Sequence, residues 1–335
     1  PQCCDSLSIV GETALAVSAA DGRTIMVAQW GDLEGSPVFS LHGTPGSRLG
    51  RHYDESAYAE VGARVITYDR PGYGGSDRHR GRRVVDCVSD VAAIADALGV
   101  ERFAVTGGSG GGPHSLAVAA RFPARVTRAG CDVGVAPFET QDFDWFDGMD
   151  PLNVREFEWA LEGEEVLARE YKREAAEMLE RIADDPSKVL GDDWQLSEAD
   201  RAQLAKPERH EVMREAMTEA FRNGVWGIVD DMLCTTKPWG FDVAEIRIPT
   251  RITYGLTDVL VGRSPIEKAV QALAPALDVL PSGPLPPNPS ELLGSSRMTK
   301  LIDAARLMYE VVLIDTAPLL PVTDAAVLAP RVDGV

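Results

Sequence analysis

Residues 103–113 read FAVTGGSGGGP, a short apolar run followed by a serine set among glycines. Glycine adopts backbone angles that other residues avoid, so this run predicts a sharp corner between a strand and a helix. The corner would lift the hydroxyl of Ser109 clear of the backbone. The feature constrains the fold because it requires a strand, a tight turn and a helix in immediate succession. Glycines that only pack a tight corner are the competing interpretation.

Short β-rich runs alternate with helical patterns through the first third of the chain. This alternation is typical of an α/β fold with a mostly parallel sheet. The pair Asp21-Gly22 predicts an opening antiparallel hairpin. A helical stripe of apolar residues covers 83–98. We expect strands at 13–18, 24–30, 37–41, 64–68, 103–106, 126–133 and 250–254.

The middle of the chain changes to charged, amphipathic helices, expected at 154–183, 198–222 and 225–233. An acidic helical block between two strands predicts a lid inserted into the sheet domain. The predicted parts are the first part of the sheet domain (1–138), a helical cap (139–240), a return strand with its loop (241–262) and a C-terminal fragment of different character (263–335).

The composition limits which classes of molecule we expect the protein to bind. The net charge of -19 argues against binding to nucleic acid or anionic lipid, and no apolar run is long enough to cross a membrane. The scattered cysteines lack metal-ligand spacing, so we expect a cytoplasmic protein without a metal or cofactor. The oligomeric state stays open. The cysteines are Cys3, Cys4, Cys87, Cys131 and Cys234.

A serine nucleophile needs donors that stabilise the oxyanion and a base that takes its proton. The amide of Gly110 would lie at a helix N-terminus, where it favours an anion. The run HGTPG at 42–46 follows a predicted strand and would bring the amide of Gly43 or Thr44 beside the serine; an ordinary tight turn is the alternative. In VITYDRPGYGGSD (65–77), Asp69 and Arg70 are expected to be structural.

These motifs, in this order, resemble those of the α/β-hydrolase family over about residues 13–254. The resemblance implies an α/β-hydrolase fold with an inserted helical cap and a small-molecule substrate that carries an ester, amide or similar bond. It also implies Ser109 as the nucleophile, an oxyanion hole from Gly110 with Gly43 or Thr44, and Asp258 as the catalytic acid. A serine at the corner argues against dehalogenase and epoxide-hydrolase chemistry, which uses an aspartate.

The catalytic histidine of that family should follow Asp258, but the chain has no histidine there. We expect His42 to be structural, His114 to point into the sheet and His210 to be solvated. A base recruited from His210 or from Asp132 stays open. The chain's histidines are His42, His52, His79, His114 and His210.

The C-terminal sequence resembles a different family. LPSGPLPPNPSELL, a helical run and VVLIDT resemble the kinase domain of bacterial tyrosine autokinases over about residues 255–335, and Asp315 would match its Walker B acid. The phosphate-binding pattern GxxxxGK[ST] is absent from the sequence, so this part should not bind nucleotide. Alternatively, the tail completes the hydrolase sheet with a helix at 265–273 and a strand at 277–280, and Pro284 stands where the base belongs.

The expected function is that of a serine hydrolase impaired by the missing histidine. The alternative is a catalytically dead, chimeric or truncated hydrolase-like binding protein that carries a non-functional kinase-family tail.

Overall fold

The computed structural model describes the chain in several stretches. Asp258, Asp315 and Pro284 lie outside the described residues. The described residues are 14–132, 134–138, 145–146, 149, 151–189, 204–253, 266–274, 277–280, 293, 295–309, 311–312, 314 and 331.

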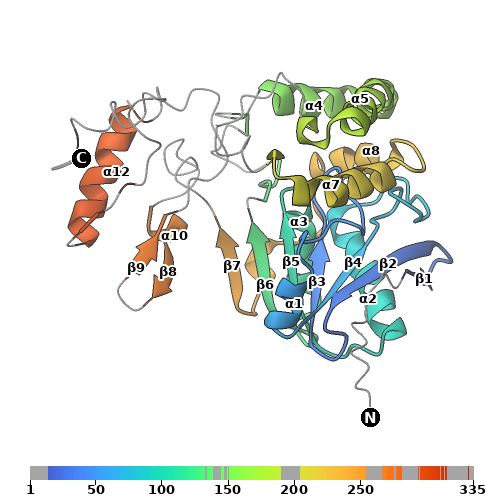
Figure 1. The fold of residues 1–335 in the computed structure, drawn as a ribbon, viewed down its shortest axis with the longest axis horizontal. Helices are drawn as coiled ribbons and strands as arrows, with labels where there is room; N and C mark the ends of the chain where they lie inside the picture. The colour runs from blue at the N-terminus through green and yellow to red at the C-terminus, as the bar shows by residue number, and fades with distance from the viewer. Residues whose placement is uncertain are drawn as a thin grey trace, which may run out of the picture.

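Seven strands form one sheet in the order β1-β2-β4-β3-β5-β6-β7 (Figure 1). From β4 to β7 in that order the strands run parallel, whereas β2 pairs antiparallel with both β1 and β4. The predicted mostly parallel α/β sheet and its opening hairpin are confirmed. The strands are β1 (Leu15–Ser18), β2 (Thr24–Gly31), β3 (Ser36–Leu41), β4 (Ala63–Tyr68), β5 (Phe103–Gly108), β6 (Val126–Asp132) and β7 (Thr250–Thr253).

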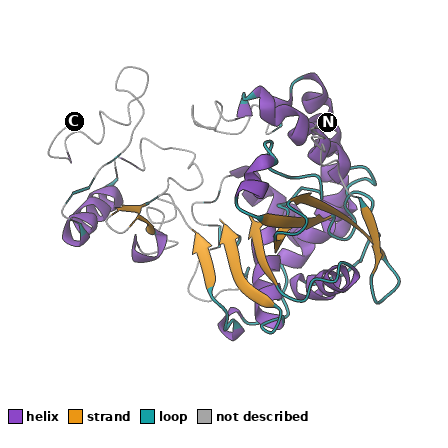
Figure 2. Cartoon of the chain, turned by 60° about the horizontal axis from the view of Figure 1, so that its bottom comes forward, coloured by secondary structure: helices purple, strands orange, loops and turns teal. Residues whose placement is uncertain are grey.

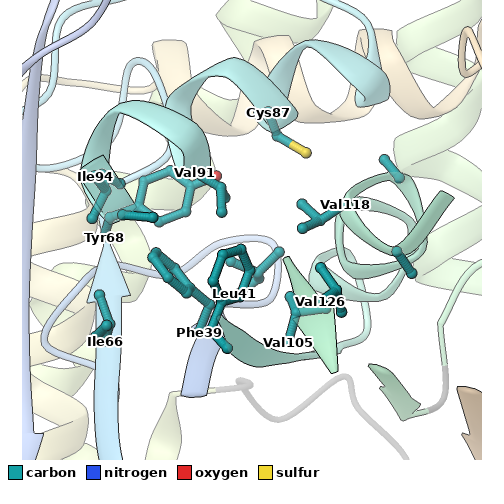
Figure 3. Close-up of a cluster of buried hydrophobic side chains, with 14 of the residues drawn as sticks. Phe39, Leu41, Ile66, Tyr68, Cys87, Val91, Ile94, Val105, Val118 and Val126 are labelled. Carbon is teal, nitrogen blue, oxygen red and sulfur yellow. The ribbon is translucent and has the colours of Figure 1, made fainter. Parts of the chain in front are cut away.

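Helices lie on both faces of this sheet (Figure 2). Alternate residues of each strand point to opposite faces, so Ile66 and Tyr68 join the main core while Val65 packs on the other face with Trp30. The main core also takes Phe39 and side chains from α2 and α3 (Figure 3). The helices of this part are α1 (Ser56–Glu60), the 3₁₀ turn η1 (Val84–Asp86), α2 (Cys87–Ala97) and α3 (Gly111–Arg121).

A block of helices separates β6 from β7 in the chain and lies over the carboxyl ends of the strands (Figure 1). It has a hydrophobic cluster of its own, which includes Phe157, Leu167 and Tyr171. We call it the helical block. Its helices are α4 (Pro151–Glu162), α5 (Glu164–Asp184), η2 (Pro186–Lys188), α7 (Pro207–Ala220) and α8 (Trp226–Thr235), and η3 (Val243–Glu245) precedes β7.

Two predicted helix boundaries in this block are wrong. The helix expected at 154–183 is two helices, because Gly163 breaks it with a φ of 117° that other residues rarely adopt. The helix expected at 198–222 covers Pro207–Ala220 in its described part, because proline fits the first turn of a helix, where its missing N–H has no partner to lose. The helix expected at 225–233 is present as α8.

The described C-terminal residues form α10 (Ile266–Ala269), β8 (Gln271–Ala274), β9 (Leu277–Val279) and α12 (Ser296–Met308). The helix expected at 265–273 ends at Ala269, and residues 271–274 are a strand. The strands β8 and β9 pair with each other in a separate sheet. The strand expected at 277–280 is therefore present but does not extend the large sheet. No helix among the described residues combines the length and the apolar character that a membrane crossing needs.

The helix α8 packs closely on the loop that follows β4. A Cβ atom on Gly72 would lie 2.9 Å from the backbone nitrogen of Gly227, and one on Gly227 would lie 2.4 Å from Cγ of Tyr73. Arg78 adds a second link, since it pairs with Asp230 at 2.8 Å and stacks over the ring of Trp226 at 4.0 Å. The absence of side chains on the two glycines lets the helix reach the sheet domain.

Replacement of Gly227 tests this close approach. In a helix, alanine is favoured over glycine by about 1 kcal/mol, so Gly227→Ala would stabilise the protein if space were available. We expect it instead to lower the free energy of unfolding by about 1–3 kcal/mol, because the methyl group overpacks against Tyr73. Urea unfolding measures the difference. A neutral or stabilised variant would contradict the prediction.

Candidate active site

Ser109 occupies the corner between β5 and α3. Its φ of 50° is the only positive φ of a non-glycine residue in the described part of the chain. Its amide donates to the carbonyl oxygen of Asp132 at 3.0 Å, and its own carbonyl accepts from the amide of Gly112 at 2.9 Å. Its side chain is exposed. The backbone is therefore held in a strained conformation that presents the hydroxyl to solvent.

The glycines around Ser109 are required by close backbone contacts. A Cβ atom on Gly107 would lie 2.2 Å from the carbonyl oxygen of Gly111, and one on Gly111 would lie 2.2 Å from the carbonyl oxygen of Leu41. A Cβ atom on Gly110 would lie 2.2 Å from Oγ1 of Thr44. The glycine run thus serves the packing of the corner as well as the exposure of the serine.

The residues predicted for the oxyanion hole lie together beside this corner. We call residues 42–45 the oxyanion loop. A Cβ atom on Gly43 would lie 3.7 Å from Cβ of Ser109, and the backbone nitrogen of Thr44 lies 3.3 Å from the Cβ position of Gly110. Among the described residues, the amides of Gly43, Thr44 and Gly110 donate to no protein acceptor. These three N–H groups are available to an anion near Ser109.

His42, the first residue of this loop, and His114, on α3, both have their ring nitrogens engaged. Nδ1 of His42 donates to the carbonyl oxygen of Gly43 at 2.7 Å, and its Nε2 accepts the backbone N–H of Arg70 at 3.2 Å. Nδ1 of His114 donates to the carbonyl oxygen of Gly110 at 2.8 Å, and its Nε2 lies 3.4 Å from Nη1 of Arg82. Because a carbonyl oxygen only accepts, each imidazole carries its hydrogen on Nδ1. Neither ring has a free nitrogen for the proton of Ser109.

The electrostatics of these rings favour the neutral form. Burial, followed by the charge of Arg70, lowers the pKa of His114 to about 3 and holds the pKa of His42 well below its usual value. The structural role expected for His42 agrees with these contacts. His114 is fully buried, as expected, beneath the corner.

Two of the remaining histidines, His52 and His210, make other contacts. Nδ1 of His52 lies 2.8 Å from the carbonyl oxygen of Asp54, and Nε2 of His210 lies 2.9 Å from the carbonyl oxygen of Leu204. His210 is half-buried rather than solvated, because α7 folds it back toward the preceding turn. In the part of the chain that the structure describes, no hydrogen bond joins a histidine to the hydroxyl of Ser109.

A buried carboxylate that the sequence did not single out lies behind the oxyanion loop. Asp231, on α8, accepts hydrogen bonds from Oγ1 of Thr44 at 2.6 Å, the hydroxyl of Tyr73 at 2.8 Å and Nε of Arg70 at 3.2 Å. Arg82 donates to its Oδ1. Burial alone would raise the pKa of Asp231, but the two guanidinium groups hold it well below its usual value. Two adjacent aspartates in the otherwise apolar run WGIVDDMLC were the only signal in the sequence.

The same region contains a group with metal-ligand chemistry. Ligand atoms of His114, Asp231 and Cys234 lie within 4.8 Å of one another and are buried. However, Arg82 donates to Asp231 and lies 3.4 Å from Nε2 of His114 and 3.6 Å from Sγ of Cys234. A guanidinium group thus already supplies the positive charge at this cluster. These residues do not fit a metal ion.

Comparison with known proteins identifies the fold on which this site lies. Residues 36–201 match the family model described as alpha/beta hydrolase fold. A carboxylesterase structure from the thaumarchaeon Nitrososphaera gargenis is 16% identical, with a TM-score of 0.54 over 88% of this chain and 98% of that chain. Epoxide hydrolase A from Mycobacterium thermoresistibile is 17% identical, with a TM-score of 0.51 over 73% of this chain and 83% of that chain. The chain has the α/β-hydrolase fold. At these identities the similarity concerns the fold alone.

A C-terminal segment is similar to bacterial tyrosine kinases, as the sequence predicted. Tyrosine-protein kinase YwqD of Bacillus subtilis is 46% identical over 99 residues, which are 27% of this chain and 42% of that protein. Tyrosine-protein kinase wzc of Salmonella typhi is 48% identical over 79 residues, which are 23% of this chain and 11% of that protein. The chain thus spans less than half the length of these relatives. The family model of the alpha/beta hydrolase fold covers residues 36–201, and the similarity to the kinases concerns 27% of the chain or less.

Acid should destabilise the protein through His114. Its pKa is about 3 in the folded protein and about 6.5 when unfolded, so the unfolded chain binds the proton more readily below pH 6.5. The stability from the neutral ring is full above pH 6.5 and is lost as the pH falls toward 3. Between pH 7 and pH 5, His114 alone should account for about 2 kcal/mol of lost unfolding free energy.

Urea unfolding of the wild type and of His114→Asn across pH 5–8 checks this contribution. The unfolding free energies of the two proteins should change in parallel from pH 7 to pH 8, where the ring is neutral in the folded and the unfolded state. Below pH 7 the wild type should lose the additional stability. Parallel curves down to pH 5 would show that His114 is not the group that titrates.

The charge of Asp231 should contribute far more to the unfolding free energy than the charge of Asp230. Asp231→Asn leaves Arg70 and Arg82 buried without a counter-charge, and we expect it to lower the unfolding free energy by about 3–5 kcal/mol. Asp230→Asn is the matched control on the same helix. Its partner Arg78 keeps partial contact with water and with Glu164, so the loss should be smaller. Equal losses in denaturant unfolding would contradict the prediction.

Proposed function

We propose that this chain is a serine hydrolase of the α/β-hydrolase family that acts on an ester, amide or similar bond of a small molecule, with turnover impaired by the missing catalytic histidine. The observation that carries the proposal is the exposed Ser109, at a φ of 50°, beside the amides of Gly43, Thr44 and Gly110, which donate to no acceptor among the described residues. The helical block, as a cap over the strand ends, would enclose the substrate.

The proposed reaction begins with attack by Oγ of Ser109 on the substrate's carbonyl carbon. A new C–O bond forms, the electrons of the carbonyl double bond move onto its oxygen, and the three amides donate to that anion. The proton of Oγ passes to water or hydroxide, because the sequence has no histidine beyond position 210 and the rings of His42 and His114 are engaged. Collapse of the intermediate breaks the bond to the leaving group, which departs with its electron pair.

This chemistry favours leaving groups that depart without protonation, such as aryl oxides and thiolates, because no imidazole stands ready to return a proton. Hydrolysis of the acyl-serine needs a base for water as well and should be slow. Asp258 would be the acid of a triad, but without a histidine it has no imidazole to orient. We expect residual catalysis of about 10³–10⁴-fold over water from binding and the oxyanion hole.

The second candidate is a catalytically silent hydrolase-like protein that binds an ester-like ligand under the helical block. The engaged nitrogens of His42 and His114 favour it, since a serine without a base can be inert. The kinase-like segment does not change this choice, because the sequence lacks the phosphate-binding loop of a kinase. A cytoplasmic location and the absence of nucleic-acid or membrane partners belong to both candidates.

Labelling by a fluorophosphonate, read by intact mass, tests the proposed nucleophile. We expect one label per chain on the wild type, formed slowly, and none on Ser109→Ala. Ser115→Ala is the matched control, because the hydroxyl of Ser115 is buried and donates to the carbonyl oxygens of Gly112 and Gly130. It should label like the wild type. A folded wild type that takes no label would favour the binding protein.

Turnover of 4-nitrophenyl acetate gives the second readout. A hydrolase without a base for deacylation should release one equivalent of 4-nitrophenol per chain in a burst, followed by a much slower steady rate. A linear time course at a rate that Ser109→Ala shares would contradict the proposal.

A further inference from the structure

The oxyanion loop is held from behind by one buried side chain. Nη1 of Arg70 donates to the carbonyl oxygen of His42, and Nη2 donates to the carbonyl oxygen of Gly43 at 2.9 Å. Both peptide bonds are trans, so each N–H points opposite to its C=O. The amides of Gly43 and Thr44 therefore point away from Arg70. Arg70, which is expected from the sequence to be structural, thus sets the direction of the amides predicted for the oxyanion hole.

Asp231 in turn holds Arg70 in place. Nε of Arg70 donates to Oδ1 of Asp231 at 3.2 Å, and Nη2 of Arg70 donates to Oδ2 of Asp231. Both side chains are almost completely buried, with exposed fractions of 1% each. A buried pair with several hydrogen bonds has one strongly favoured arrangement, because the loss of any bond leaves a desolvated charge without a partner. The orientation of the guanidinium group is thus determined by α8.

Thr44 is the second connection between Asp231 and the loop. Its Oγ1 donates to Oδ2 of Asp231 at 2.6 Å, and the same oxygen lies only 2.2 Å from the Cβ position of Gly110. The hydroxyl therefore stands between the carboxylate and the corner that carries Ser109. Its bond to Asp231 fixes the distance between the amides of Thr44 and Gly110.

We propose that Asp231 is a positioning residue that, through Arg70 and Thr44, aims the amides of Gly43 and Thr44 at the anion formed when Ser109 attacks a carbonyl group; this rests on the proposed function. Asp231 touches no reacting atom. It lies on α8, the last helix of the helical block, and thus makes the geometry of the oxyanion hole depend on how that block packs on the sheet domain.

Thr44→Val is the decisive variant. It removes the hydroxyl but leaves the backbone amide, and Asp231 keeps its bonds from Arg70, Arg82 and Tyr73, so the protein should remain folded. Thr44→Ser retains the hydroxyl. Thr235→Val is the matched control: this buried threonine on α8 donates to the carbonyl oxygens of residues 231 and 232 of its own helix and does not contact the loop.

The probe is phenylboronic acid, which mimics the tetrahedral intermediate. Oγ of Ser109 adds to boron through a new B–O bond, the serine proton passes to water, and boron becomes tetrahedral and negatively charged. The ¹¹B NMR shift separates tetrahedral from trigonal boron. We expect the wild type, Thr44→Ser and Thr235→Val to form the tetrahedral adduct with similar dissociation constants. Thr44→Val should bind at least about 10-fold more weakly, since one oxyanion donor is misdirected.

The outcomes separate this inference from the proposed function. If Thr44→Val, folded by circular dichroism, binds the boronic acid as tightly as the wild type, the positioning role is wrong and the nucleophile stands. If the folded wild type forms no tetrahedral adduct, or forms one that Ser109→Ala retains, the proposed function is wrong and the positioning role with it. Weak binding by Thr44→Ser as well would also overturn the role of the hydroxyl.

Discussion

The buried carboxylate of Asp231 and the guanidinium groups of Arg70 and Arg82 form the interaction on which the described hydrolase fold depends. The two arginines lie in the single segment between β4 and η1, and Asp231 lies 161 residues beyond Arg70 in the chain. Removal of a charge from water costs several kcal/mol, so none of these groups is tolerable without the others. The ion pairs therefore join the helical block to the sheet domain. The two glycines, Gly72 and Gly227, allow α8 to approach the sheet domain this closely.

The same positive charges shape the chemistry beside Ser109. Burial, followed by the charge of Arg70, lowers the pKa of His42 and of His114 and keeps both rings neutral. Each ring then uses its nitrogens on neighbouring backbone or side-chain groups. Among the described residues, the amides of Gly43, Thr44 and Gly110 lie beside Ser109, and no histidine nitrogen is hydrogen-bonded to its hydroxyl.

The sequence predicted most of the fold because its signals are local. Alternation of apolar residues identified the strands, and the glycine run identified the corner at Ser109. The prediction of helices and strands failed where one residue overrides a helical pattern, as Gly163 does. It also failed where a short apolar stretch is compatible with either a helix or a strand, as at 271–274. The residues predicted for an oxyanion hole, Gly43, Thr44 and Gly110, were selected by their order along the chain, and the structure brings them together beside Ser109.

The sequence by itself determined that the chain presents a serine at a glycine-framed corner, that it has no histidine after the return strand and that its C-terminal segment is kinase-like. Only the tertiary structure decided that His42 and His114 are engaged on both nitrogens and that Asp231 joins α8 to the oxyanion loop. The physical reason is distance along the chain. Periodicity and turn chemistry act within a few residues, whereas the partner of a buried charge is chosen by packing between distant segments.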